Sequence, residues 1–231
     1  MPASVEIFGS VVVVLGAFNP AILTPDWLEH HKLIGNEDAD KARQGALVVT
    51  RQISRFETDW FVLQVTDEQF SVTSNGPLAP AIKDLAVGAL SLLPHTPVRA
   101  LGVNFFAHYK MTTMEEYHKV GDVLAPKDVW DRLFPGEEQS AGLLDLTIVI
   151  EPAKRGDRPK TPDKKRLTVQ PSAKVPFGMF LSYNDHHELP ADGTQKPTIE
   201  WCIKTIEEQW QPIWEDSKRV FEGVINHAIK N

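Results

Sequence analysis

The sequence has a single cysteine and no long apolar run, and both shortages exclude whole classes of protein. Cys202 alone cannot form an intramolecular disulfide or a metal site built from several thiolates. The apolar stretch 11–18 is far shorter than the roughly 20 residues that a membrane-spanning helix needs. The amino-terminal residues lack the positive segment that is typical of a signal peptide, and Glu6 interrupts the apolar run that follows such a segment. These absences favour a cytoplasmic protein in a reducing compartment.

Several catalytic and nucleotide-binding motifs are also missing. The chain contains no Gly-x-Gly-x-x-Gly, no Gly-x-x-x-x-Gly-Lys-Ser/Thr, no Gly-x-Ser-x-Gly and no His-Glu-x-x-His pattern. Their absence removes most of the support for a nucleotide-binding enzyme, a serine hydrolase or a zinc protease. Nothing next to Cys202 in the sequence supplies a base, so we expect a core thiol and not a nucleophile. We predict no cofactor.

Apolar and charged residues occur in the proportions of a folded, soluble chain. Of the 231 residues, 42% are hydrophobic and 24% are charged, which allows a sizeable core and argues against disorder. A chain of this length forms one large domain or two closely packed halves. The formal net charge of −7 disfavours non-specific binding of nucleic acid or anionic lipid over the surface as a whole.

Apolar periodicity divides the chain into strands and helices. Alternating or β-branched patterns predict strands, and spacings of three and four predict helices. The first part has a strand at 5–18, a helix from a Thr24 cap to about 34 that Gly35 ends, strands at 47–56, 60–66 and 70–74, and a helix at 80–93. The second part has a strand at 98–111, helices from Thr112 or Thr113 to 124 and at 126–134, strands at 143–151, 167–172 and 178–187, and a helix from 198 to the carboxyl terminus.

The order of these elements predicts the fold class. Strands that follow one another through short turns pair antiparallel, and the helices then cover one face of the sheet. We therefore expect an α+β fold, with an antiparallel sheet and helices packed on one face, in a single domain of residues 1–231. The same order also describes two degenerate halves, 1–97 and 98–231, that each follow a strand-helix-three-strand-helix plan.

If the apolar face of the sheet meets the helices, the opposite face carries aromatic, amide, hydroxyl and imidazole side chains. Such a mixture suits the binding of a polar ligand, and it is also the composition of a plain solvated sheet face. The candidate binding residues are Trp60, Gln64, Asn104, Phe106, His108, Ser182, Asn184 and His186.

The segment 184–188 is the densest group of acid–base residues and potential metal ligands. Side chains alternate along a strand, which separates these residues into Asn184, His186 and Glu188 on one face and Asp185 and His187 on the other. His108 can join the first group from a neighbouring strand, which makes His108 and His186 the candidates for acid–base catalysis. The alternative is a polar strand end that leads into a loop. We predict no metal site.

Basic residues are concentrated between two predicted strands, at 154–166. We interpret this segment as a long hairpin loop that can contact phosphate, although it contains no aromatic residue for base stacking. A plain solvated loop is the alternative that we favour. The basic residues are Lys154, Arg155, Arg158, Lys160, Lys164, Lys165 and Arg166.

The predicted carboxyl-terminal helix has an apolar seam along one face. Pro212 lies inside it, so we expect a kink or a division into two helices. Tryptophans are common anchors of protein interfaces, and this helix contains Trp201, Trp210 and Trp214. We therefore expect it to bind a protein partner or a second copy of the chain. The seam consists of Ile199, Ile203, Ile206, Trp210, Ile213, Val220, Val224 and Ala228.

Two stretches of the chain carry a resemblance. They are Trp-Phe-Val-Leu-Gln-Val-Thr at 60–66, followed by Phe-Ser-Val at 70–72, and Pro-His-Thr-Pro-Val-Arg-Ala-Leu-Gly-Val-Asn at 94–104. With the terminal amphipathic helix, they resemble a family of uncharacterised bacterial proteins of about this length that occur sporadically across genomes. The likeness spans most of the chain. It implies no established activity or catalytic residue, and its patchy distribution implies mobile or defence-related gene clusters.

Three functions are compatible with these patterns. The first, which we favour, is a non-catalytic binding or adaptor protein inside a larger bacterial assembly, because catalytic motifs are missing while an open polar face is present. The second is an enzyme that uses the His/Asp/Asn cluster on the open sheet face. The third is a nucleic-acid-binding protein that uses the sheet face and the basic segment 154–166.

Overall fold

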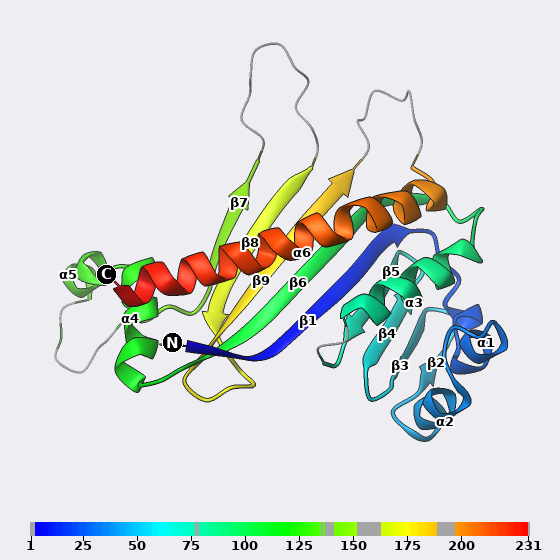
Figure 1. The fold of residues 1–231 in the computed structure, drawn as a ribbon, viewed down its shortest axis with the longest axis horizontal. Coiled ribbons are helices and arrows are strands. Elements are labelled where there is room, and N and C mark those ends of the chain that lie inside the picture. Colours follow the sequence, from blue (N-terminus) through cyan, green and yellow to red (C-terminus); the bar gives the residue numbers. More distant parts are fainter. Residues whose placement is uncertain are drawn as a thin grey trace, which may run out of the picture.

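The computed structural model describes residues 3–76, 79–134, 136, 141–151, 163–188 and 197–230. These residues form one antiparallel sheet of nine strands in the order β2-β3-β4-β5-β1-β6-β9-β8-β7. The helices that contact the sheet lie on one face, where α6 and α3 cross in front of the strands (Figure 1). The predicted α+β class, with an antiparallel sheet and helices on one face, is therefore confirmed.

Two strands of 14 residues, β1 (Ala3–Gly16) and β6 (Val98–Met111), form the centre of the sheet. They pair antiparallel along their whole length. The strands beyond β1 are β5 (Gln69–Ser74), β4 (Phe61–Thr66), β3 (Ile53–Glu57) and β2 (Val48–Val49). Those beyond β6 are β9 (Gly178–Glu188), β8 (Lys164–Pro171) and β7 (Leu146–Ile150).

Each central strand is followed by helices, then by a run of antiparallel strands and then by a single helix. After β1 come η1 (Pro20–Ile22), α1 (Pro25–His30) and α2 (Asn36–Gln44), and α3 (Ala79–Ser91) follows β5. After β6 come α4 (Met114–Leu124) and α5 (Asp128–Leu133), and α6 (Ile199–Lys230) follows β9. The two runs of strands lie on opposite sides of the central pair. That residues 1–97 and 98–231 are two degenerate copies of one unit stays a prediction.

The core between the sheet and α6 contains a cluster of aromatic rings. The ring of Phe105 is fully buried, and its centroid lies 5.0 Å from that of Trp210 and 5.4 Å from that of Trp214, both edge to face. The ring of Phe8 packs against Trp214 at 4.6 Å. Edge-to-face pairs are favourable beyond the area they bury, so this cluster is a main contact between α6 and the two central strands.

The helix α6 is continuous, although Pro212 lies inside it. Pro212 faces solvent, so its ring clashes with no packed neighbour and its missing N–H weakens the helix on the exposed side. Of the two predicted outcomes, division into two helices is therefore wrong.

The apolar seam of α6 differs from the prediction in its second half. Ser217, Phe221 and Ile225 are buried there, whereas Val220 and Val224 are only half-buried. The prediction missed this path because a serine counts as polar in a hydrophobic pattern. The Ser217 hydroxyl is satisfied inside the helix, where it donates to a carbonyl of the preceding turn at 2.8 Å.

The first helical region also differs from the prediction. The helix α1 begins after Thr24, whose hydroxyl accepts a hydrogen bond from the Trp27 N–H at 3.2 Å, as the cap prediction required. It ends at His30, and Gly35 is the N-cap of α2 instead of the end of α1. The helix α2 was missed because it is almost entirely polar and buries only two alanine side chains, which give little apolar periodicity.

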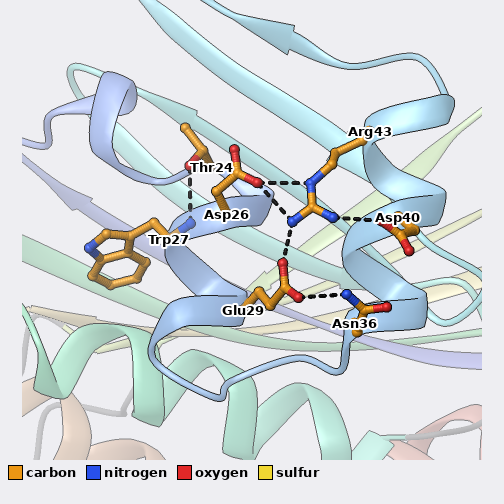
Figure 2. A network of polar contacts seen from close by, with 7 residues as sticks. All are labelled: Thr24, Asp26, Trp27, Glu29, Asn36, Asp40 and Arg43. Carbon is orange, nitrogen blue, oxygen red and sulfur yellow. Dashed lines mark hydrogen bonds and ion pairs between the residues drawn. The ribbon is translucent and has the colours of Figure 1, made fainter.

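Arg43 connects α2 to α1, as Figure 2 shows. Its guanidinium lies 2.8 Å from the carboxylate of Asp26 and 2.6 Å from that of Asp40, and it also contacts Glu29. Asn36 donates a hydrogen bond to Glu29 at 2.9 Å. Single exposed ion pairs add little stability, but one arginine shared by several carboxylates orients two helices that are too short to be stable alone.

Two predicted strand boundaries are wrong. The segment 47–56 is a hairpin in which β2 pairs with β3, and not one strand. Lys164, Lys165 and Arg166 belong to β8 and pair with β9, so they are not part of a loop. Charged residues hide the alternation that marks a strand. The other predicted basic residues of this segment lie outside the described residues, and they are Lys154, Arg155, Arg158 and Lys160.

The single cysteine lies in the core, as predicted. Cys202 is fully buried in α6, and burial raises the pKa of its thiol to about 12. A thiol with such a pKa is almost never ionised near neutral pH, so it is a poor nucleophile and behaves as a small apolar side chain. Within the described ranges, no helix is both long and apolar enough to span a membrane.

Candidate functional site

Six of the eight predicted binding residues lie together on two neighbouring strands. Asn104 pairs with Asn184 and Phe106 with Ser182, so their side chains share one face. This face is turned away from α6, and no described helix lies on it; we call it the open sheet face. The six residues are Asn104, Phe106 and His108 on β6 and Ser182, Asn184 and His186 on β9.

The other two predicted residues lie elsewhere. Gln64 shares the open sheet face, but β4 is three strands from β6, which separates them by about 14 Å at about 4.8 Å per strand. Trp60 precedes β4, and its ring packs on that of Phe61 at 4.5 Å and against the core. The prediction that Trp60 lies on the open face is wrong, because strand alternation does not extend to a residue outside the strand.

Three aromatic rings form a continuous group on the open sheet face, which we call the aromatic platform. It consists of Phe106, His108 and Phe180, with ring centroids 4.9 to 6.2 Å apart. A Cβ atom at Gly9 would collide with the ring of Phe106, so this ring lies over the backbone of β1. Phe180 is not among the predicted binding residues, although its parity with Ser182 places it on this face.

His108 is the most enclosed member of the aromatic platform. It is 5% exposed, and its Nδ1 lies 2.7 Å from the hydroxyl of Ser172 in the turn after β8. Burial, and to a smaller extent the charge of Lys174, lowers the pKa of His108 below its ordinary value. The imidazole is therefore neutral at pH 7 and adds no positive charge to the aromatic platform.

A second group of polar residues lines a depression at the other end of β9. Its cavity volume is about 290 Å³, and its walls come from β7, β8 and β9; we call it the basic depression. In it, His186 Nε2 lies 2.7 Å from Glu188, and Lys164 lies 3.6 Å from Glu151. The lining residues are Val149, Lys164, Arg166, Asn184, His186 and Glu188.

The two histidines proposed for catalysis do not converge. His186 pairs with Gly102 and His108 with Phe180, so six residues of β6 separate their positions. At about 3.4 Å per residue this is about 20 Å, far beyond the reach of a shared proton transfer. Among the described residues, no three His, Cys, Asp or Glu side chains are placed to hold a metal ion. The interpretation that His108 and His186 form one catalytic site is therefore wrong.

Asp185 and His187 point to the opposite face and join a charged network beneath α6. Asp185 is 4% exposed and lies 3.3 Å from His187 Nε2 and 3.6 Å from Lys165 Nζ. Lys165 also lies 2.9 Å from Asp216 of α6. Lys165 therefore bridges Asp185 and Asp216 and fastens α6 to β8 and β9, whereas the buried His187 Nε2 makes no hydrogen bond to another described residue.

Replacing Asp185 with asparagine is expected to raise the free energy of unfolding at pH 7. Burial raises the pKa of Asp185, and attraction to His187 and Lys165 offsets this only in part. The carboxyl group therefore favours folding most below about pH 4, and this contribution is lost as the pH rises through the folded-state pKa. Urea unfolding of both proteins between pH 4 and pH 8 measures the difference, which should close toward pH 4.

Asp216 is the matched control, because its pKa is shifted in the opposite direction. Hydrogen bonds from Arg219 and Lys165 lower the pKa of Asp216. Its stabilising effect is therefore present at neutral pH and is lost as the pH falls through the folded-state pKa. Asp216→Asn should destabilise the protein at pH 7. A loss of stability at pH 7 in both variants would mean that the ion pairs of Asp185 outweigh its burial.

The helix α5 exposes an apolar face. None of its residues is buried, and the exposed fractions are 46% for Trp130, 63% for Leu133 and 60% for Phe134, the C-cap residue. With Val129, these side chains share one side of the helix, and we call them the α5 surface. The sequence predicted the helix but not its exposure, because a helix that faces the core has the same spacing.

Comparisons with known proteins give no relative for this chain. No protein-family model matches it, and no curated protein matches it. The resemblance to a sporadically distributed bacterial family therefore stays a prediction, and the function has to be argued from the geometry of the chain itself.

Proposed function

We propose that the protein is a non-catalytic adaptor that binds a partner protein through the α5 surface, inside a larger bacterial assembly. The observation that carries this proposal is the exposure of Trp130, Leu133 and Phe134 on a helix that buries none of its residues. Aromatic side chains gathered on an exposed patch are costly in water, and such patches commonly mark interaction sites.

The chemistry of the α5 surface indicates the form of the partner site. A short helix with two aromatic rings and a leucine on one side fits a hydrophobic groove, as amphipathic helices do in many complexes. Trp130 is the expected anchor, because tryptophan combines a large apolar area with few rotatable bonds. The partner should therefore present an apolar groove with a pocket for an indole ring.

The proposal replaces α6 with α5 as the element that binds the partner. Trp210 and Trp214 pack against Phe105 in the core of their own chain. Trp201 is also partly buried against the core of its own chain. All three indole rings of α6 are therefore engaged at home, which weakens the reason for assigning the partner to the carboxyl-terminal helix.

Replacing Trp130 and Phe134 together with alanine is expected to abolish stoichiometric recovery of the partner. Each truncation of an interface anchor costs about 2 kcal/mol or more, so the pair should weaken binding at least several hundredfold. Tagged wild-type and double-variant proteins would be purified from the native host, and the recovered proteins identified by mass spectrometry. The partner would then be purified and the two affinities measured by calorimetry.

Leu92→Ala is the matched control, because Leu92 is also an exposed apolar residue, at 39%, but lies just beyond α3. It should leave partner recovery unchanged. The double variant should unfold within about 0.5 kcal/mol of the wild type, since it changes only exposed side chains. Equal recovery of the same proteins by all three forms would reject the α5 surface as the binding site.

A further inference from the structure

The open sheet face carries a local charge opposite to that of the whole chain. It presents Lys110, Lys164 and Arg166 on β6 and β8, against the carboxylates of Glu188 on β9 and of Glu151 just after β7. Lys164 shares its charge with Glu151, whereas no ion pair of Arg166 is found among the described residues. The net charge of −7 therefore arises elsewhere on the chain, and an anion that approaches these strands meets cations.

The aromatic platform lies between these cations. Lys110 is two residues from His108 on β6, and Arg166 lies on β8 across from Asn184. The rings of Phe106 and Phe180 are half-buried, so part of each ring remains accessible. Accessible rings on a sheet, flanked by basic side chains, are the arrangement on which proteins stack unpaired bases.

Amide and hydroxyl groups fill the space between the platform and the basic depression. Asn104, Asn184 and Ser182 lie there, and Asn184 donates a hydrogen bond to Asn104. The path from Lys110 to the position opposite His186 covers eight residues of β6, or roughly 27 Å at about 3.4 Å per residue. This length accommodates several nucleotides of an extended strand.

We propose that the open sheet face binds single-stranded nucleic acid, with unpaired bases on Phe106 and Phe180, beside the buried ring of His108, and phosphates at Lys110, Lys164 and Arg166. A double helix keeps its bases stacked on one another, so it would leave the platform unused. An acidic peptide would use the cations but not the rings. This inference does not depend on the α5 surface, which lies on a different element of the chain.

Fluorescence anisotropy with a labelled oligothymidylate of about 15 nucleotides tests the proposal. We expect binding at about 50 mM salt that weakens on going to 200 mM, with a slope of log K against log salt near −2 for three phosphate contacts. A duplex of the same length should bind at least tenfold more weakly. Phe106→Ala should weaken binding of the single strand by about five- to a hundredfold.

Two variants and a control separate the contribution of the aromatic rings from that of the basic side chains. Phe106→Leu keeps an apolar side chain over Gly9 but removes the ring face, so it should weaken binding even if Phe106→Ala fails to fold. Arg166→Ala should reduce the magnitude of the salt slope by about 0.7. Lys204→Ala, on the exposed side of α6, is the matched control and should change neither quantity.

Three results would overturn the proposal. They are the absence of binding at low salt, equal affinity for the duplex, and an affinity that Phe106→Leu leaves unchanged. Competition by poly-glutamate as strong as that by unlabelled oligothymidylate would also overturn it, because it would show a general polyanion surface. The Trp130/Phe134 double variant should bind the oligonucleotide normally, so a failure here and a failure of the adaptor proposal are distinguishable.

Discussion

Replacing Phe105 with alanine is expected to lower the free energy of unfolding by about 3–5 kcal/mol. Phe105 is fully buried on β6, where the sheet meets α6, and its ring contacts those of Trp210 and Trp214. Alanine removes both edge-to-face contacts and leaves a cavity that stiff indole rings fill poorly. Urea unfolding followed by tryptophan fluorescence measures the loss, because two of the reporting residues are the neighbours of the cavity.

Phe134→Ala is the control for this prediction. It removes the same phenyl group from a position that is 60% exposed, so the change should stay within about 0.5 kcal/mol. Phe105→Leu should cost less than Phe105→Ala, since leucine refills part of the cavity. A loss below about 1 kcal/mol for Phe105→Ala would mean that this contact does not hold α6 on the sheet.

Replacing Pro212 with alanine is expected to raise the free energy of unfolding by about 2 kcal/mol. Proline inside a helix is about 3 kcal/mol less favourable than alanine, because it lacks an N–H and crowds the preceding turn. Proline also lowers the conformational entropy of the unfolded chain. Removing it therefore costs roughly 0.4–1 kcal/mol of stability, which offsets part of this gain. Pro212 faces solvent, so alanine loses no packing there. Thermal and urea unfolding both measure the gain.

Gln211→Ala is the control for the gain in helix propensity. Gln211 is the exposed neighbour of Pro212, and its amide donates to Glu215 at 2.8 Å. The change should alter stability by no more than about 0.5 kcal/mol. A neutral or destabilising effect of Pro212→Ala would contradict this prediction, and it would mean that the local helix geometry at proline helps α6 to fit the twisted sheet.

Long periodic elements could be predicted from the sequence, whereas short polar ones could not. The bounds predicted for the strand at 98–111 agree with those of β6, because every second residue from Leu101 to Met111 is apolar. The helix α2 and the strand start at Lys164 were missed, since alanine and charged side chains carry little periodic signal. In these places burial by the rest of the chain, and not the local pattern, decides the structure.

The face of each candidate residue could be predicted, but the distances between them could not. Alternation alone placed Asn104, Phe106 and His108 on one side of β6. The distance of about 20 Å between His108 and His186 depends on the register of β6 against β9, which lie about 80 residues apart in the sequence. The exposure of Trp130 likewise depends on whether other elements pack against α5, which the local sequence pattern does not indicate.

The place of β1 at the centre of the sheet determines how the chain must fold. Its neighbours are β5 and β6, so β1 waits for its second partner until residue 111 exists. At about 5–20 residues per second, this delay lasts roughly 5–20 seconds on the ribosome. During that time four consecutive valines, 11–14, have no completed sheet to enter. Folding is therefore dominated by late, long-range pairing, and nascent β1 is the strand most in need of protection from aggregation.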